Sequence, residues 1–511
     1  AKSYHNPDND PDLPFLWKAT QWAKRGAVIA MVLPGRIFLK QTESGIKAFQ
    51  AILNGMEVTG ILNGTNLSDT AVWPGMNQPF MLFFARNLVP AANHHFHFVT
   101  PHLERSLNEA GRLRIDYQSA QPVATVGAIQ EPWMLKALAV GTSLDIEIVR
   151  KINGLKWPTV KSYWDSKGLC SGRGYELSSS SRPENALSMY GLPDFVPPPN
   201  DGFSVDIRTL PKFRQSAVRR AWHMELYAPP LLIVPESPGA HGYSPKSWVV
   251  RETAVFNRSY YGFSAAGSKE ANSLISILHL ITHCDLFRYN VLMTSSRMAA
   301  ERRTFLKGNI ENFPLPAPYL LSESQLQWAE YLSIRLETAS SKPWQEINNF
   351  IYDLYDLDKY DRQVVKDTLE VAAPFKEARD RANRPPKKDE RSAFYAELHQ
   401  LLTPSFDLTN EPLAVNEVEV EKQGFQSSWH FFSVSSPTGS PVPTQAAQNQ
   451  LISLITEEAN STGCSRVIVH GERYLLVGII GQYRYWTLSR ARLCALDILR
   501  HHLDAFPIRR S

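Results

Sequence analysis

An apolar run close to the start of the sequence constrains the fold more than any other feature. The residues "AVIAMVLP" at 27–34 are almost continuously apolar, and only a short stretch precedes them. A run of this kind is typical of a strand buried on both faces of a parallel sheet. Because nothing before it can cover both faces, we expect this strand to belong to the last part of an α/β sheet whose earlier strands lie elsewhere.

The segments around this run alternate between helical and extended patterns. Apolar residues at helical spacing predict helices at 14–26 and 44–56, and short apolar runs predict strands at 57–64 and 79–87. Doubly wound sheets bind ligands at the carboxyl ends of their strands. We therefore predict that residues 1–92 form the C-terminal part of a Rossmann-like α/β sheet, with an open border where the sheet is incomplete.

Composition limits the class of protein. The 511 residues carry a net charge of only +4, so any nucleic-acid surface must be a local basic patch. The four cysteines form no CxxC pair, which argues against a zinc site and a disulfide framework and favours the cytoplasm. No apolar run reaches the roughly 18 residues that a membrane span needs, and we expect no membrane partner.

The rest of the chain divides by pattern into three further predicted domains. Residues 93–320 are rich in aromatic residues, Pro, Gly and Ser, and predict a mixed β-rich domain that contains one long helix at 269–292. Residues 321–400 predict a helical region, and residues 401–511 predict a small α/β unit. The predicted fold class is therefore a multidomain combination of α/β and α+β parts.

Three stretches together suggest a known family. They are 24–53 with 58–87, "SKGLCSGRGYE" at 166–176, and 273–318, which contains "IENFPLP" at 310–316. In this order and spacing they resemble the C-terminal half of N6-adenine DNA methyltransferases, of the restriction–modification and phage-defence type with a TaqI-like specificity domain. The resemblance covers residues 1 to about 320. It implies that 1–92 end a methyltransferase domain and that 93–320 form the target recognition domain.

The family's catalytic features are missing from this sequence. Its members bind S-adenosylmethionine through a glycine-rich motif and catalyse through an Asn/Asp-Pro-Pro-aromatic tetrapeptide. Neither motif is present, and "HNPDND" at 5–10 lacks the second Pro and the aromatic residue. We therefore assign no catalytic residue and expect this chain alone to be inactive. The catalytic half would come from a split gene, a partner chain or a longer form of the protein.

Methylation of an adenine amine requires the base to be flipped out of the duplex. The resemblance makes Phe38, just after the "LP" turn, a candidate for one wall of the flipped-base pocket. The alternative, which we favour, is that Phe38 packs in the core or supports the loop.

Basic residues cluster in "VDIRTLPKFRQSAVRRAW" and predict contacts with DNA. Arginine suits bidentate contacts to phosphate and guanine. A solvated helix face is the alternative for this segment. "SSRMAAERRTFLKG" has its cations diluted by Glu301, and Arg173 lies between two glycines that permit positive φ or close approach to a ligand. The predicted DNA-binding residues are Arg173, Arg208, Lys212, Arg214, Arg219, Arg220, Arg302 and Arg303.

Other motifs predict no site. His95 and His97 share one face of an expected strand, but no carboxylate or cysteine lies near them in sequence, so we predict no metal site. The chain has no GxSxG, Walker or HExxH motif, which leaves hydrolase and nucleotide-triphosphatase functions unsupported.

The sequence thus predicts the DNA-recognition portion of an N6-adenine methyltransferase. It would bind double-stranded DNA and present a flipped adenine to a catalytic half that carries S-adenosylmethionine. A stand-alone DNA-specificity or adaptor protein without methyltransferase activity is the alternative, with 321–400 and the C-terminal unit as surfaces for partners.

Overall fold

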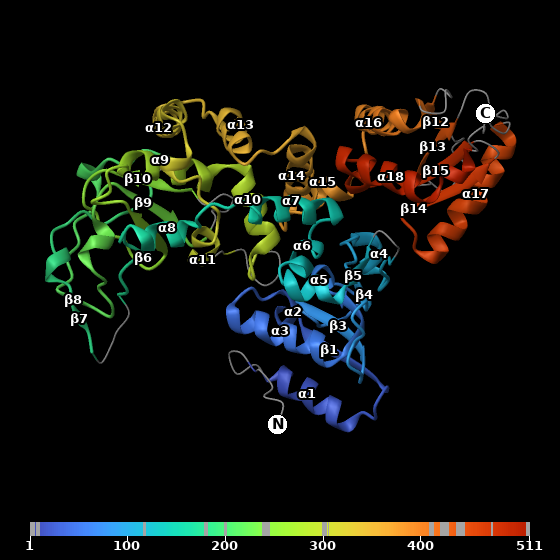
Figure 1. The fold of residues 1–511 in the computed structure, drawn as a ribbon, viewed down its shortest axis with the longest axis horizontal. Helices are drawn as coiled ribbons and strands as arrows, with labels where there is room; N and C mark the ends of the chain where they lie inside the picture. The colour runs from blue at the N-terminus through green and yellow to red at the C-terminus, as the bar shows by residue number, and fades with distance from the viewer. Residues whose placement is uncertain are drawn as a thin grey trace. The chain divides into compact units, whose positions relative to one another are not determined.

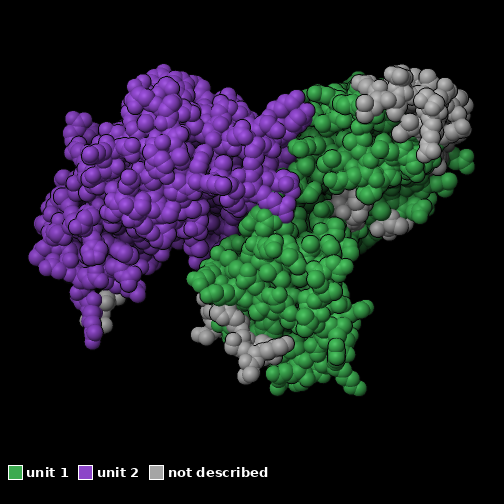
Figure 2. Space-filling model, in the orientation of Figure 1, with its two compact units in different colours: residues 1–146, 366–511 green, residues 147–365 purple. Residues whose placement is uncertain are grey.

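The computed structural model describes residues 6, 11–115, 119–177, 182–198, 202–237, 246–298, 304, 306–407, 413–418, 429–435, 445–471 and 474–506. The architecture is mixed α/β, with several small sheets and many helices (Figure 1). Two compact units are present: residues 1–146 with 366–511, and residues 147–365 (Figure 2). The four predicted domains divide the chain more finely, and their boundaries stay a prediction. Within the described residues, none of the helices combines the length and the apolar character that crossing a bilayer requires.

The N-terminal part of the first unit contains a five-stranded sheet in the order β1-β3-β2-β4-β5. Only β2 and β4 run parallel, and the other neighbours are antiparallel. The elements are α1 (Asp12–Trp22), β1 (Val28–Pro34), α2 (Arg36–Leu39), α3 (Glu43–Gly55), β2 (Glu57–Asn63), β3 (Phe80–Arg86), β4 (His95–Val99), α4 (Arg105–Glu109), β5 (Ala120–Ala124), α5 (Thr125–Gln130), α6 (Met134–Leu138) and the start of α7 (Ser143–Asn153).

The environment of β1 differs from the prediction. The run at 27–34 was expected to be buried on both faces of a parallel sheet, but β1 is an antiparallel edge strand whose side chains alternate between buried and exposed. Ile29 and Leu33 are buried, whereas Val28 and Val32 are 69% and 46% exposed. The prediction that β1 has apolar residues on both faces is right, but in the described part of the chain no element covers the face with Val28 and Val32.

Helices cover the other face of this sheet. Phe38 of α2 stacks on Phe83 of β3, with 5.5 Å between the ring centroids, which places α2 on the buried face. The neighbouring helix α3 begins at Thr42, whose hydroxyl accepts a hydrogen bond from the Gly45 N–H, and its apolar stripe includes Phe49 and Ile52. One face is therefore a packed core, and the other is open beside β1.

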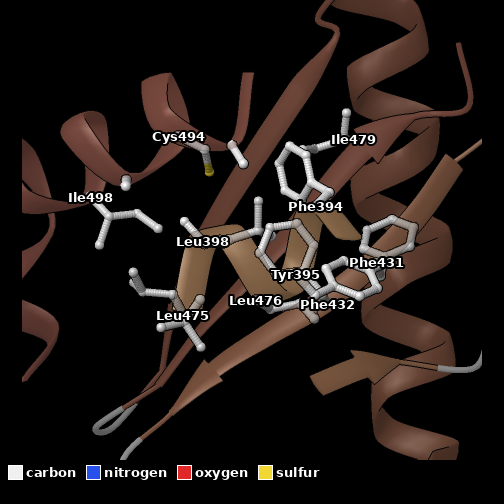
Figure 3. Packing of buried hydrophobic residues seen from close by; sticks show 14 of the residues in the cluster. Phe394, Tyr395, Leu398, Phe431, Phe432, Leu475, Leu476, Ile479, Cys494 and Ile498 are labelled. Atoms are coloured by element: carbon white, nitrogen blue, oxygen red, sulfur yellow. The ribbon is translucent and has the colours of Figure 1, made fainter. Parts of the chain in front are cut away.

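The C-terminal part of the first unit is an antiparallel sheet in the order β12-β13-β15-β14. Aromatic residues of one helix, including Phe394 and Tyr395, pack with Leu475 and Leu476 of the sheet and with Ile498 of the last helix (Figure 3). The elements are α15 (Lys376–Asn383), α16 (Lys388–Asp407), β12 (Ala414–Val418), β13 (Trp429–Ser435), α17 (Gln445–Thr462), β14 (Arg466–Gly471), β15 (Tyr474–Ile480) and α18 (Leu488–His501).

The second unit, residues 147–365, is built on an antiparallel sheet in the order β10-β9-β11-β6. A separate two-stranded ribbon pairs β7 with β8 (Figure 1). The strands are β6 (Ser171–Arg173), β7 (Glu184–Asn185), β8 (Ala217–Val218), β9 (Leu231–Pro235), β10 (Trp248–Val250) and β11 (Tyr260–Ser264). The helices are α8 (Val160–Ser166), α9 (Ala271–His283), α10 (Asp285–Thr294), α11 (Lys307–Glu311), α12 (Glu323–Thr338), α13 (Trp344–Leu354) and α14 (Lys359–Val371), the last of which ends in the first unit.

The long helix predicted at 269–292 is two helices. Cys284 is extended (φ −80°, ψ 156°), and its thiol accepts a hydrogen bond from the Phe287 N–H at 3.4 Å, which starts α10. The sequence pattern predicted one continuous helix because the residues before and after Cys284 are mostly apolar and buried in both helices.

Candidate nucleic-acid interface

The basic segment, defined here as residues 206–222, is held on the second unit by buried apolar residues. Phe213, Val218 and Ala221 are 2%, 3% and 8% exposed and belong to the core beneath the sheet. The cations between them face solvent, because the chain alternates between these anchors and exposed positions. Local packing therefore presents the predicted DNA-binding side chains on the surface.

One carboxylate joins two arginines from separate parts of the sequence. Glu176 lies 3.5 Å from Arg219 and 3.5 Å from Arg258. The backbone reinforces this arrangement, since the Arg219 N–H donates to the Glu176 carbonyl at 2.8 Å and the Arg258 N–H donates to the Tyr175 carbonyl at 2.8 Å. We call Glu176, Arg219 and Arg258 the Glu176 cluster. It carries one net positive charge, and its carboxylate lies within ion-pair distance of both guanidinium groups.

Arg173 of β6 lies beside this cluster. Its Nε donates to the Arg258 carbonyl at 2.6 Å, and its guanidinium forms an ion pair with Glu236. Glu236 also lies 3.9 Å from Arg297, so this carboxylate too is shared by two arginines. Arg173 and Arg219, which come from different sequence motifs, are thus connected through Arg258.

The glycines around Arg173 have a structural role. Neither has a positive φ. A Cβ at Gly174 would lie 2.1 Å from the Phe256 carbonyl oxygen, and one at Gly172 would lie 3.2 Å from Leu226. The glycines therefore permit close packing within the unit, and the expected approach to a ligand is not needed to explain them.

The remaining cations of the basic segment differ in how they are held. Arg214 lies over the ring of Tyr190 at 6.0 Å, and Arg220 lies over the ring of Trp222 at 5.4 Å. In the described part of the chain, neither arginine is paired with a carboxylate. Cation–π contacts orient a guanidinium without neutralising it. These two arginines therefore keep their full charge for an anionic partner.

The other two cations are at the start of the segment. Lys212 is exposed, and its backbone bridges to Pro193. Arg208 donates from Nε and from a terminal nitrogen to the two oxygens of Asp206, each at 3.0 Å. These bonds lower the pKa of the Asp206 carboxyl and leave Arg208 with its charge balanced. Arg208 therefore differs from Arg214 and Arg220, because its guanidinium is paired with a carboxylate of its own segment.

A partly buried hydrogen bond links residues of the core under the basic segment. The Tyr175 hydroxyl donates to Asp194 at 2.8 Å. Burial raises the pKa of the Asp194 carboxyl, and the bond from Tyr175 opposes that rise. The Tyr175 hydroxyl thereby helps to keep the Asp194 carboxylate charged. Tyr175 immediately precedes Glu176 in the sequence.

Two other sets of predicted site residues have different outcomes. Arg302 and Arg303 lie outside the described residues. Phe38 is 1% exposed and stacks on Phe83 in the core. This burial favours the core-packing interpretation of Phe38 over its interpretation as a wall of a base pocket, since the side chain has almost no surface to offer a base.

Sequence reasoning missed three residues of this surface. Arg258 completes the Glu176 cluster, and Tyr190 and Trp222 lie under arginines while remaining 51% and 39% exposed. The signal for Trp222 was present in the sequence, because "RRAW" places an aromatic residue two positions after the second of two adjacent arginines. Arg258 was not predictable, since it joins Arg219 only through the fold.

The carboxyl end of β1 is the place where an α/β sheet would be expected to bind a ligand such as S-adenosylmethionine. This end leads into α2, whose Ile37, Phe38 and Leu39 are all buried, and Arg36 pairs with Asp12 at 3.7 Å. Among the described residues, 36–39 therefore contribute buried apolar side chains and one paired arginine at this point, and the glycine-rich motif that binds S-adenosylmethionine in the resembling family is absent from the sequence. Among the described residues, no group of His, Cys, Asp or Glu is arranged to hold a metal ion.

Comparison of this chain with known proteins finds similar solved structures but no matching family or curated sequence. The type IIG restriction endonuclease BpuSI matches with a TM-score of 0.26 and 11% identity over 70% of this chain and 49% of its own. The type IIL restriction-modification enzyme MmeI, solved in complex with DNA, matches with a TM-score of 0.40 and 10% identity over 70% of this chain and 52% of its own. This chain spans about half the length of both.

Proposed function

We propose that this chain is the DNA-recognition part of a site-specific N6-adenine DNA methyltransferase of a restriction–modification or phage-defence system. The second unit acts as a TaqI-like target recognition domain and binds duplex DNA. A catalytic half, either a separate chain or another subunit, binds S-adenosylmethionine and transfers the methyl group. The observation that carries this proposal is the open edge of the sheet at β1, which lies in the segment that resembles the methyltransferase domain.

The edge at β1 has the properties of a surface for pairing with another strand. In the described part of the chain, no strand pairs with its outer side. The N–H and C=O groups of an edge strand are a template for a further strand. Val28, Val32 and Phe84 lie on the same open face, since Ala30 pairs with Phe84 across the sheet, and they are 69%, 46% and 40% exposed. A catalytic half that extends the sheet would bury them.

The surface of the second unit supports binding to DNA. Arg214 and Arg220 are free of carboxylates in the described residues, and the Glu176 cluster adds a further net charge. Cations on phosphate release counterions, so such binding weakens as salt rises. Base readout and flipping of adenine would follow from this docking, with the flipped base delivered to the catalytic half.

The test is complementation of methyl transfer. The chain is mixed with a neighbouring-gene product that carries the glycine-rich motif and the Asn/Asp-Pro-Pro-aromatic tetrapeptide, and labelled methyl transfer to adenine N6 in duplex DNA is measured. We expect transfer from the mixture and none from this chain alone. Val32→Lys, which places a charge on the open face, should abolish transfer because it blocks burial of that face.

The matched control is Val89→Lys, because Val89 is 70% exposed and lies outside the strands. This control should retain full transfer. Methyl transfer by this chain alone would contradict the proposal, as would full complementation by the Val32→Lys variant.

The alternative function is an adaptor without methyltransferase activity, and one feature favours it. Trp328, Tyr331 and Ile334 of α12 are 41%, 49% and 51% exposed, and the two aromatic rings stack at 5.1 Å. An exposed apolar stripe on a helix is suited to bind a protein partner. An adaptor would bind DNA and a partner protein but would not complement methyl transfer with any catalytic half.

A further inference from the structure

Trp222 has a backbone conformation that its residue type rarely adopts. Its φ is +65°, in the left-handed region that favours glycine. A bulky residue there is a genuine outlier. Residues held in this way cluster at functional sites, where surrounding contacts impose the conformation.

Two hydrogen bonds fix the backbone immediately before Trp222. The Ala221 N–H donates to the Glu184 carboxylate at 2.7 Å, and the Tyr227 hydroxyl donates to the Ala221 carbonyl at 3.1 Å. Ala221 and Tyr227 are 8% and 0% exposed, so these contacts belong to the core of the unit. The peptide groups on both sides of Ala221 are thus held by side chains from other segments, and the chain at Trp222 has little freedom to relax.

This conformation leaves an aromatic ring on a basic surface. The Trp222 side chain is 39% exposed although tryptophan is usually well buried. The guanidinium of Arg220 lies 5.4 Å from the centre of the Trp222 ring. Arg219, which belongs to the Glu176 cluster, immediately precedes Arg220 in the sequence. An exposed aromatic face beside positive charge is the combination that binds unstacked bases along a nucleic-acid backbone.

We propose that Trp222 is a base-stacking residue of the DNA interface. Its indole stacks on a nucleobase that has left the duplex stack, while Arg220 pairs with a neighbouring phosphate. This inference rests on the proposed function, because it requires DNA on the second unit. The inference adds a specific ligand, an unstacked base. Positive charge alone would bind the phosphates equally well whether or not a base were unstacked.

The experiment measures binding of the full chain to a fluorescent duplex and to the same duplex with one bulged base. We expect the wild-type chain to bind the bulged duplex more tightly. Trp222→Ala should weaken binding to the bulged duplex by about 5- to 150-fold, the range expected for loss of one base–aromatic stack. Its slope of log K against log salt should remain that of the wild type, because no charge is lost. Trp222→Phe should stay within about 3-fold of the wild type.

Arg220→Gln is the contrasting variant. It should lower the salt slope by about 1, because it removes one phosphate contact while the indole remains. Trp222→Gly is the folding control, since it removes the ring and suits the positive φ. Its urea midpoint should be at or above that of Trp222→Ala, while its binding to the bulged duplex should be equally weak.

The outcomes separate the two proposals. Wild-type binding to DNA with equal affinities for Trp222→Ala and wild type would overturn the stacking role and leave the proposed function intact. Absence of any DNA binding by the wild-type chain would overturn both.

Discussion

Carboxylates decide how the arginines of the second unit are presented. Glu176 and Glu236 each lie between two arginines, so each group of three side chains keeps one net positive charge. Arg208 is different, because Asp206 alone accepts both of its hydrogen bonds. The sequence predicted Arg173, Arg208 and Arg219 as DNA-binding residues but not Arg258, and only the fold shows which guanidinium groups share a carboxylate and which have one to themselves.

The first prediction concerns Gly174. An alanine there would bring its Cβ within 2.1 Å of the Phe256 carbonyl oxygen, and a backbone atom cannot move aside cheaply. Gly174→Ala should lower the free energy of unfolding by about 1–3 kcal/mol, measured by urea denaturation. Gly308→Ala is the control: it lies in α11 with only Asn312 near, at 3.9 Å, and should stabilise by up to about 1 kcal/mol. Equal stability of the two variants would contradict the packing role of Gly174.

At the scale of elements, the strand and helix patterns in the sequence predicted much of the N-terminal sheet but not its pairing. An apolar run such as "AVIAMVLP" has the same appearance whether its second face is covered by the same chain or left open. The direction of β1 depends on β3, its neighbour in the sheet, which no local pattern encodes. The break at Cys284 was likewise invisible, because a cysteine thiol is an unusual helix cap.

The second prediction concerns the pH response of α9. Burial lowers the pKa of His283 to about 4 and lowers that of His279 as well. The pKa of a histidine in an unfolded chain is near 6.5. Between that pKa and the lowered pKa of the folded state, the unfolded state therefore binds more protons than the folded state. Stability is therefore fully present above about pH 6.5 and falls as the pH drops toward 4. At pH 5 the neutral burial of His283 should cost about 2 kcal/mol of stability, and His279 should act in the same direction.

Urea midpoints at pH 7 and pH 5 measure this effect. His283→Gln should reduce the difference between the two midpoints, whereas His95→Gln, an exposed residue of β4, should leave it unchanged. A midpoint that does not fall between pH 7 and pH 5 would contradict the burial of these imidazoles.

In the whole molecule, the two units have different features, and we propose a separate role for each: pairing with a catalytic half and binding to DNA. The first unit contains a sheet with an open edge, and the second contains a surface of arginines and exposed aromatic rings. The sequence predicted the basic segment because its cations are adjacent along the chain. It did not predict Arg258 or the conformation of Trp222, because both depend on contacts between distant residues.

The most direct test of the account is the salt dependence of DNA binding by the full chain. Affinity for duplex DNA is measured by fluorescence anisotropy between 50 and 200 mM salt, roughly the range over which phosphate contacts have large effects. Arg214→Glu with Arg219→Glu should weaken binding and lower the slope of log K against log salt by about 2. The control pair Lys18→Glu with Lys47→Glu, exposed residues of α1 and α3, should match the wild type. An unchanged affinity and slope in the arginine variant would contradict the assignment of this surface to DNA.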